Sequence, residues 1–197
     1  MKGIAMKPAI FLDRDGTLIH DEDYLSDPKK VKYFSGAAEA LRTLKKAGYL
    51  LVVVTNQSGV ARGYYPESAV KRIHRKMKRD LSKRGAAPDA FFYCPHYPGG
   101  KVKSLSRSCA CRKPKTGMVQ QAQRVLPIDL KRSFMVGDKR DDMLLSVNAR
   151  LAGGLLVRTG KGKMSEKELK KKNIPKTWVV SNLRQAVKKI LSLDVTP

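Results

Sequence analysis

Short apolar runs alternate with amphipathic stretches along most of the chain. The runs typical of strands lie at residues 8–12, 50–54, 89–93, 133–136, 154–158 and 177–180. Between them, the spacing of apolar residues predicts helices at about 36–47, 66–84, 117–125, 140–150 and 182–192. Strands that are continuously apolar are typical of a parallel sheet with helices on both faces. The pattern therefore predicts an α/β fold with three layers, in which helices cover both faces of a parallel sheet.

Turn signals and length define the organisation further. Gly48 and Gly85 follow two of the predicted helices, as expected at helix C-termini. Ser181 is the expected N-cap of the closing helix, and residues 178–180 are the expected edge strand. A chain of 197 residues fits one domain. We therefore expect a single domain over residues 1–197, with a short flap at about 16–32 and no second cap domain.

Composition excludes some classes and leaves one question open. No apolar run approaches the ~20 residues of a membrane span, and residues 1–7 lack a signal-peptide pattern, so a cytoplasmic protein is expected. The formal net charge is +24, with basic residues concentrated at 71–84, 101–115 and 161–176. Solvated helix faces explain such clusters, but a basic surface also attracts polyanions. Charge alone does not decide between these explanations.

The most specific chemical signal is the segment 11–18, Phe-Leu-Asp-Arg-Asp-Gly-Thr-Leu. It places Asp13 and Asp15 two residues apart where an apolar strand ends. Residues two apart on a strand share a face, and open α/β sheets bind ligands beyond the carboxyl ends of their strands. Both carboxylates are therefore expected at one point beyond the sheet.

Three further segments follow in order, and each adds polar groups at the end of an apolar run or in a loop. They are Val-Val-Val-Thr-Asn-Gln-Ser-Gly at 52–59, Arg-Lys-Pro-Lys at 112–115, and Phe-Met-Val-Gly-Asp-Lys-Arg-Asp-Asp at 134–142. Together with the first motif, this order resembles the haloacid dehalogenase (HAD) superfamily of aspartate-nucleophile phosphatases. The resemblance implies the three-layer, Rossmann-like parallel sheet of the haloacid dehalogenase type, with a minimal cap.

The resemblance also implies roles for individual residues. Asp13 would attack phosphorus, and Asp15 would protonate the leaving oxygen and later deprotonate water. Thr55 and Asn56 would donate hydrogen bonds to the phosphoryl group, and Lys113 would neutralise its charge. Lys115 is an alternative to Lys113 by spacing, but the superfamily places its lysine directly before the proline.

A magnesium site is implied at the same point. Asp13, Asp138 and the backbone carbonyl of Asp15 would supply the hard oxygen ligands that this ion prefers. Asp142 would support the site from further away, whereas Asp141 is a weaker candidate. Acids at a helix N-terminus offer a purely structural explanation for either residue. Lys139 is a further candidate for contact with the reacting group.

All three cysteines lie in the segment 94–111 together with one histidine, in the patterns Cys94-Pro-His96 and Cys109-Ala-Cys111. A Cys₃His set forms a closed, tetrahedral zinc site without an open position for catalysis. The segment is therefore expected to be a zinc loop, with free thiols or a labile disulfide as the alternatives. His20 and His74 are expected to be ordinary surface residues.

The zinc loop narrows the resemblance to a branch of the superfamily, the histidinol-phosphatase-like subfamily that contains the D-glycero-D-manno-heptose 1,7-bisphosphate phosphatases. This likeness spans about residues 9–160 and implies removal of the 7-phosphate in the synthesis of nucleotide-activated heptose for lipopolysaccharide core. Arg62 and Arg112 would then recognise the unreacted phosphate. The expected partner is a small sugar bisphosphate bound by a monomer, with no membrane contact.

Three alternatives remain open at this point. The first is a histidinol-phosphate phosphatase, which Arg112 disfavours because that substrate carries a positive amine. The second is a nucleic-acid 3′-phosphatase, which the net charge favours but the zinc loop does not. The third is a basic binding protein on an inactive scaffold, which would require a lost catalytic residue, whereas Asp13, Asp15, Lys113 and Asp138 are all present.

Overall fold

In the computed structural model, which describes residues 5–193, six strands form one parallel sheet in the order β3-β2-β1-β4-β5-β6. The strands are β1 (Lys7–Leu12), β2 (Leu50–Asn56), β3 (Ala90–Cys94), β4 (Ile128–Gly137), β5 (Gly153–Val157) and β6 (Thr177–Val180). The helices are α1 (Ala37–Lys46), α2 (Glu67–Ser82), α3 (Gly117–Val125), α4 (Arg140–Asn148), α5 (Gly162–Lys171) and α6 (Leu183–Leu193). Two short 3₁₀ helices, η1 (Pro28–Lys30) and η2 (Lys103–Leu105), lie in loops.

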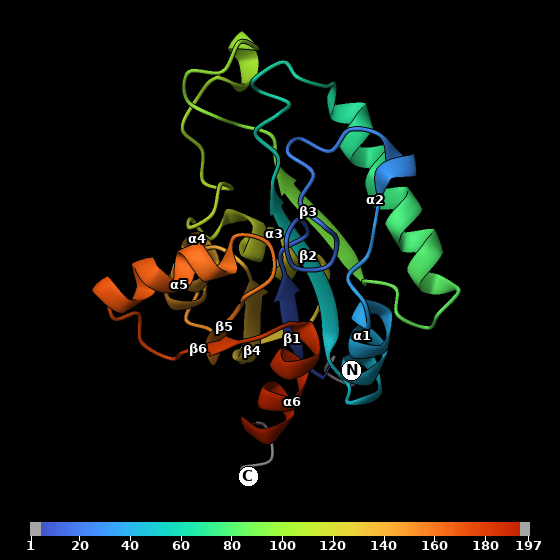
Figure 1. The fold of residues 1–197 in the computed structure, drawn as a ribbon, viewed down its shortest axis with the longest axis vertical. Helices are drawn as coiled ribbons and strands as arrows, with labels where there is room; N and C mark the ends of the chain where they lie inside the picture. Colours follow the sequence, from blue (N-terminus) through green and yellow to red (C-terminus); the bar gives the residue numbers. More distant parts are fainter. Residues whose placement is uncertain (1–4, 194–197) are drawn as a thin grey trace.

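Helices cover both faces of the sheet, and the alternation of strand side chains explains why (Figure 1). Along β1, Ile10 and Leu12 belong to a core shared with α1, α2 and α6, whereas Ala9 and Phe11 belong to a core shared with α3, α4 and α5. Because successive side chains of the central strands point to opposite faces and are apolar on both, the strands are buried on both sides. The three-layer α/β/α prediction is confirmed.

The strand order fixes where a ligand site can form. The chain builds outward from β1 to β3 in one direction and from β4 to β6 in the other, so the connections diverge between β1 and β4. Helices that leave neighbouring strands in opposite directions open a crevice at the carboxyl ends of those strands. The acidic motifs follow β1 and β4 directly, and the Thr-Asn pair ends β2.

Most predicted elements agree with the structure, and three differences have local causes. β4 begins at Ile128 rather than near residue 133, because the exposed Lys131 and Arg132 interrupt its apolar pattern beside a register shift against β1. α5 was not predicted, because only Gly162, Ser165 and Leu169 of this helix are buried and no apolar stripe marks it.

The third difference is a helix cap. Asn182, not Ser181, caps α6, since its Oδ1 accepts a hydrogen bond from the backbone N–H of Gln185. The edge position of β6 and the positive φ of Gly48 and Gly85 agree with the sequence prediction. Residues 1–4 of the segment examined for a signal peptide lie outside the described part of the chain.

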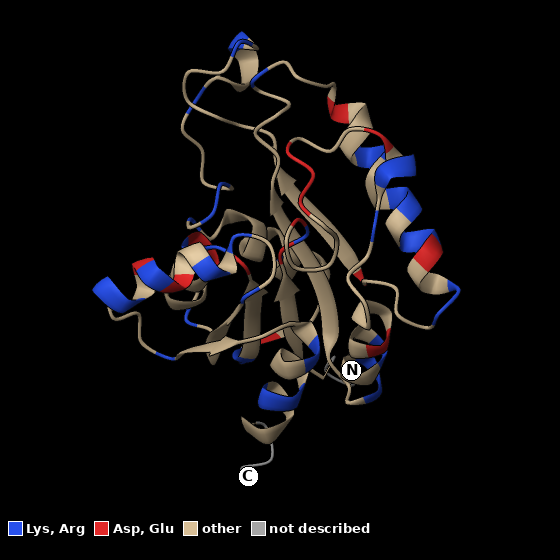
Figure 2. Cartoon of the chain, in the orientation of Figure 1, with Lys and Arg blue, Asp and Glu red and all other residues tan. Residues whose placement is uncertain are grey.

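Two long loops extend beyond the carboxyl ends of the strands. The first joins β1 to α1 and contains η1, which packs against α2; Asp21 and residues 23–25 of this loop line the crevice. The second joins β3 to α3 and contains the three cysteines and η2. No helix among residues 5–193 is long and apolar enough to span a membrane. Lysine and arginine occur over most of the outer surface, most densely along α2 and α5 (Figure 2).

Candidate functional site

Three buried carboxylates meet where β1 and β4 end. Asp13 follows β1, Asp138 follows β4, and Asp142 lies in the first turn of α4. One oxygen from each lies within 4.8 Å of the others, and the three side chains are at most 4% exposed. Three like charges in so small a buried volume are unfavourable without nearby cations. The site therefore depends on positive charge from outside the carboxylate group.

Lys113 supplies part of that charge from the loop before α3. Its buried Nζ lies 2.9 Å from Asp13 Oδ1 and 2.6 Å from Asp142 Oδ1, and it donates a hydrogen bond to the carbonyl of Val54. Lys115, the alternative by spacing, is exposed and donates to Ser108 instead. The structure thus places Lys113, and not Lys115, among the carboxylates.

These contacts separate the acids electrostatically. Although burial favours the neutral form, Lys113 and Lys139 lower the pKa of Asp13. Burial and the charge of Asp13 raise the pKa of Asp138 to about 8, and burial raises that of Asp142 to about 6 despite Lys113. Asp13 is therefore the carboxylate that stays ionised most readily, as a nucleophile requires.

The donor set fits a hard divalent cation. Asp138 Oδ1 is buried and accepts no hydrogen bond from the described residues, so one of its lone pairs is available to an ion. Gly16 and Gly160 lie against the same carboxylate, and a Cβ at either position would collide with Asp138 Oδ2. Oxygen-only donors suit Mg²⁺. Asp13 and Asp138 are those expected from the sequence, Asp142 lies within the same group, and the carbonyl of Asp15 stays a prediction.

Asp15 lies in a separate hydrogen-bond network with a buried arginine. Arg14 is 1% exposed, and its Nε and Nη2 donate to both oxygens of Asp15 at 3.0–3.1 Å. Gln57 Nε2 donates to Asp15 Oδ2 at 2.9 Å and to Thr55, while Gln57 Oε1 accepts from Arg14 and Tyr65. A bidentate guanidinium fixes the plane of a carboxylate. Arg14 and Gln57 therefore hold Asp15 beside, but apart from, the three buried acids.

His74 lies behind this network, and the prediction that it is a surface residue is wrong. It lies on the buried face of α2, 3.5 Å from Arg14 Nη1, and its ring stacks on Phe91. Burial, together with the charge of Arg14, lowers the pKa of His74 to about 3. The imidazole is therefore neutral at physiological pH. His20, in contrast, is exposed as expected.

The residues expected to bind phosphate take different positions. Thr55 is buried beside Gln57 and lines the cavity. Asn56 also lines it, but its side chain holds the backbone of Lys113: Oδ1 accepts from the Lys113 N–H at 3.0 Å, and Nδ2 donates to the carbonyl at 3.2 Å. Asn56 thus positions the lysine, and its remaining amide hydrogen is the one available to a ligand.

A cavity of about 310 Å³ opens above these groups. Arg62 and Arg112 line it and both approach the ring of Tyr97, with guanidinium carbons 3.7 and 5.2 Å from the ring centroid. Lys139 Nζ lies 3.9 Å from the carboxylates of Asp13, Asp138 and Asp21. The structure thus brings every predicted catalytic and phosphate-binding side chain to one cavity, with the two arginines on the side of the cysteine loop.

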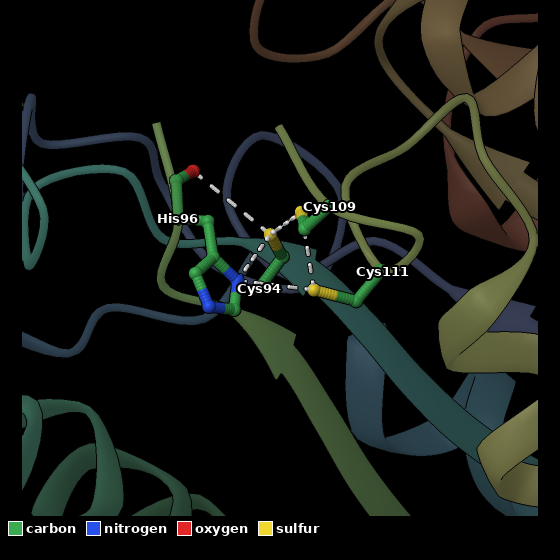
Figure 3. Close-up of side chains that lie close together, drawn as sticks. All are labelled: Cys94, His96, Cys109 and Cys111. Carbon is green, nitrogen blue, oxygen red and sulfur yellow. Dashed lines mark hydrogen bonds between the residues drawn. The ribbon is translucent and has the colours of Figure 1, made fainter. Parts of the chain in front are cut away.

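The second cluster consists of the predicted zinc ligands (Figure 3). Cys109 Sγ lies 3.4 Å from the Sγ atoms of both Cys94 and Cys111, and His96 Nδ1 lies 3.3 Å from Cys111 Sγ. No disulfide links them. Ligands at roughly 2.3 Å from a tetrahedral zinc ion are separated by about 3.8 Å, close to these spacings. The four side chains point toward one another and could hold a metal ion.

The thiols of this cluster are electrostatically coupled. Hydrogen bonding with Cys94 and Cys109, together with His96, lowers the pKa of Cys111 to about 5 although burial opposes this shift. Cys111 directly precedes Arg112 and Lys113, so the cluster lies at the base of the segment that carries two residues of the cavity. A metal ion bound here would fix the course of that segment.

Sequence reasoning missed Arg14, Gln57, Tyr97 and the structural part played by Asn56. Arg14 and Gln57 lie in the motifs at 11–18 and 52–59, but only their contacts in the structure reveal that they hold Asp15. Charged residues are rarely fully buried unless they are paired. The position of Arg14 between Asp13 and Asp15 was therefore an available signal that it pairs with one of these acids. His74 lies four residues after Val70 and three before Met77, so helical spacing placed it on the apolar face, but the sequence did not indicate that this face meets Arg14.

Comparisons with known proteins agree with this geometry. The HAD-hydrolase-like family model matches residues 110–186. A D-glycero-β-D-manno-heptose-1,7-bisphosphate 7-phosphatase of Pasteurella multocida (strain Pm70) is 49% identical over 156 residues, covering 79% of this chain and 84% of that protein. The protein of the same name in Escherichia coli (strain K12) is 43% identical, covering 92% and 94%.

Solved structures give the same picture. The crystal structure of D,D-heptose 1,7-bisphosphate phosphatase from B. bronchiseptica, complexed with magnesium and phosphate, is similar with a TM-score of 0.80 and 34% identity. The similarity covers 94% of this chain and 99% of that chain. The corresponding protein from Burkholderia thailandensis has a TM-score of 0.67 and 31% identity, covering 94% and 99%.

The cysteine cluster predicts one zinc ion per chain. Replacing Cys109, which lies between the other two thiols, in a C109S variant should release the zinc and lower the melting temperature, because binding energy of a structural zinc contributes to folding. Metal analysis by mass spectrometry and thermal unfolding measure both effects. A wild-type chain that folds stably with no zinc would contradict the assignment, and S108A serves as the matched control in the same loop.

The neutral His74 predicts a specific pH dependence of stability. Its pKa is about 3 in the folded chain, below the ordinary value of 6.5, so the unfolded state binds the extra proton. Stability from this residue is present above pH 6.5 and is lost as the pH falls below it, by about 2 kcal/mol between pH 7.5 and 5. The free-energy difference between wild type and H74Q should shrink by that amount. Denaturant unfolding measures it; a pH-independent difference would show that His74 is accessible to protons when folded.

Proposed function

The chain belongs to the family of HAD-like phosphatases that contains the heptose-1,7-bisphosphate 7-phosphatases, and we propose that it removes the 7-phosphate of D-glycero-D-manno-heptose 1,7-bisphosphate. One observation carries the proposal: Asp13, paired with Lys113 and grouped with Asp138, lies in the same cavity as Arg62 and Arg112. A nucleophile for one phosphate and guanidinium groups for another suit a bisphosphate. The two similar proteins are named for this substrate and are matched over most of their length, which supports the same substrate here.

Asp13 begins the reaction in this proposal. Lys113 lies against Oδ1, so Oδ2 is the oxygen that attacks phosphorus, forming a P–O bond as the bond to the sugar oxygen breaks. A protonated Asp15 gives its proton to the leaving sugar oxygen. Lys113 and Lys139 offset the charge that gathers on the equatorial oxygens, together with the hydroxyl of Thr55. The product of this step is an aspartyl-phosphate on Asp13 and the free sugar hydroxyl.

Water then breaks the intermediate. Asp15, now ionised, removes a proton from the water as its oxygen attacks phosphorus, and the bond to Asp13 breaks to release phosphate. Arg14 and Gln57 limit the orientations of the Asp15 carboxyl during both steps. Asp13 and Asp138, with Asp142 beside them, would hold a magnesium ion. When bound, this ion supplies positive charge to the phosphoryl oxygens and to the nucleophile.

The finer assignments rest on the same cavity. The flap residues Asp21, Asp23, Tyr24 and Leu25 also line it, so they would enclose the sugar. We assign the unreacted phosphate to Arg112 first and to Arg62 second, because Arg112 directly precedes Lys113. The product, heptose 1-phosphate, retains the phosphate that nucleotide activation requires. The monomeric state and the cytoplasmic location stay predictions.

Substitution at the proposed nucleophile gives the most direct test of the mechanism. D13N removes the attacking oxygen but retains the side-chain volume, so activity should fall by at least about a thousandfold while circular dichroism stays unchanged. K113M should also be strongly impaired, whereas K115M, at the exposed lysine two residues away, should retain wild-type kcat. A folded D13N chain with appreciable turnover would exclude Asp13 as the nucleophile.

A substrate comparison tests the proposed function itself. Phosphate release in the presence of magnesium should be measured with both anomers of heptose 1,7-bisphosphate, histidinol phosphate and a 3′-phosphorylated oligonucleotide. We expect kcat/KM for a bisphosphate anomer to exceed the others by about a hundredfold or more, which is roughly 2.7 kcal/mol of discrimination. R112M should reduce this preference more than it reduces activity on a monophosphate. Preference for the oligonucleotide or histidinol phosphate would replace the proposal.

A further inference from the structure

The exposed face of α2 is a concentrated positive surface outside the cavity. Eight of the 18 residues from 67 to 84 are lysine or arginine, about twice their share of the whole chain. Seven of them are exposed: Lys71, Arg72, Arg75, Lys78, Arg79, Lys83 and Arg84. Figure 2 shows these charges following one another along the length of the helix. We call this set the α2 basic face.

The arrangement is regular. Arg72, Arg75, Arg79 and Lys83 recur at intervals of three and four residues, which places them in one row along the helix. The row spans 11 residue steps, from Arg72 to Lys83, so at 1.5 Å per residue it presents positive charge over about 17 Å. η1 packs beside α2 and adds the exposed Lys29 and Lys30 to the same side.

Apart from Lys71, which pairs with Glu67, these charges form no ion pair within the described part of the chain. The two acids of the segment are already engaged: Glu67 with Lys71 and Tyr93, and Asp80 with Lys76. No ion pair among residues 5–193 involves Arg72, Arg75, Lys78, Arg79 or Lys83. Like charges four residues apart, such as Arg75 and Arg79, destabilise a helix by about 0.2–0.5 kcal/mol per pair. The helix retains this repulsion at its surface, where an anionic partner would relieve it.

The opposite side of α2 explains why the helix tolerates the repulsion. Ala69, Val70, Ile73, Met77 and Leu81 are buried against the sheet, so packing rather than surface charge holds the helix in place. The exposed charges therefore do not serve the stability of the fold. They do not line the cavity either, since none of the seven contributes to its wall.

We infer that the α2 basic face binds the phosphate backbone of duplex nucleic acid. A duplex carries one negative charge per ~1.7 Å of its axis, so a row of about 17 Å meets roughly 10 phosphate charges. No large apolar side chain is exposed between residues 67 and 84, so the face has neither the wedge that inserts into a membrane nor an aromatic platform for single-stranded bases. Binding would be independent of base sequence and strongly salt-dependent.

The test compares two variants of equal net charge. In the first, R72Q/R75Q/R79Q/K83Q, four charges of the α2 basic face are neutralised. In the control, K163Q/K167Q/K170Q/K171Q, four exposed lysines of α5 are neutralised. Binding of a fluorescent DNA duplex of about 20 base pairs is measured by anisotropy from about 50 to 200 mM salt. Wild type is expected to bind with a dissociation constant on the order of 10⁻⁴–10⁻⁶ M.

The α2 variant should bind at least about tenfold more weakly and lose up to about 3.6 from the slope of log affinity against log salt, at 0.9 per phosphate contact. The α5 control should stay within about threefold of wild type. Equal losses in both variants would reduce the effect to net charge and overturn the inference. Absence of duplex binding by wild type, tighter binding to phosphatidylglycerol vesicles, or equal competition by polyglutamate would overturn it as well.

This inference does not rest on the proposed function, and the two can fail separately. Because none of the substituted residues lines the cavity, the α2 variant should retain wild-type kcat/KM for small phosphate substrates. Thermal unfolding checks that it is folded. A variant that loses duplex affinity at unchanged activity supports a binding surface distinct from the catalytic cavity.

Discussion

The pairing of Lys113 with the buried carboxylates is the interaction on which the rest of the site depends. Asp13, Asp138 and Asp142 converge because β1 and β4 are neighbours whose carboxyl ends lie at one edge of the sheet. Removing such charges from water is costly unless cations compensate, and Lys113 is the cation buried among them. Its backbone is held by Asn56, and its segment begins at Cys111. The two clusters of the molecule are therefore joined through one lysine.

Through that connection, the cysteine cluster supports the catalytic groups although it does not take part in the reaction itself. The loop from 94 to 111 is rich in polar residues and has few apolar side chains with which to hold itself. A metal ion bound by three thiolates and an imidazole would provide that constraint with covalent-like rigidity. Arg112 and Lys113 follow directly, so one constraint orients the cation for the reacting phosphate and the guanidinium assigned to the other. Catalytic groups held within about 0.5 Å need this kind of support.

Much of this could be predicted from the sequence because the same pattern of apolar strands and polar strand ends determines both the fold and the position of the site. Continuous apolar strands predicted the sheet, and polar residues at strand ends predicted where Asp13, Thr55 and Asp138 would meet. Features that depend on distant contacts were not accessible: His74 was expected at the surface and is buried against Arg14. α5 escaped because a solvated helix with few buried side chains has no apolar stripe. The assignment of Asn56 to phosphate stays a prediction, but its contact with Lys113, 57 residues away, was not predicted.

Acidic side chains are concentrated at the cavity, whereas the rest of the chain is strongly basic. Six aspartates line the cavity, and Asp138 lies beside them, so this one region holds seven of the 17 acidic residues of a chain whose net charge is +24. Salt screens individual charges beyond about 8 Å. An approaching phosphate is therefore attracted by the summed positive charge of the exterior and not by any single buried group. Within the cavity it meets carboxylates, which Lys113, Lys139, Lys161, the arginines and a bound cation offset. The basic exterior can therefore raise the rate of encounter with any polyanion, but productive binding of a phosphate ester requires the cations at the bottom of the cavity. Selectivity consequently resides in the few groups around Asp13, and the outer charge is free to serve a different ligand.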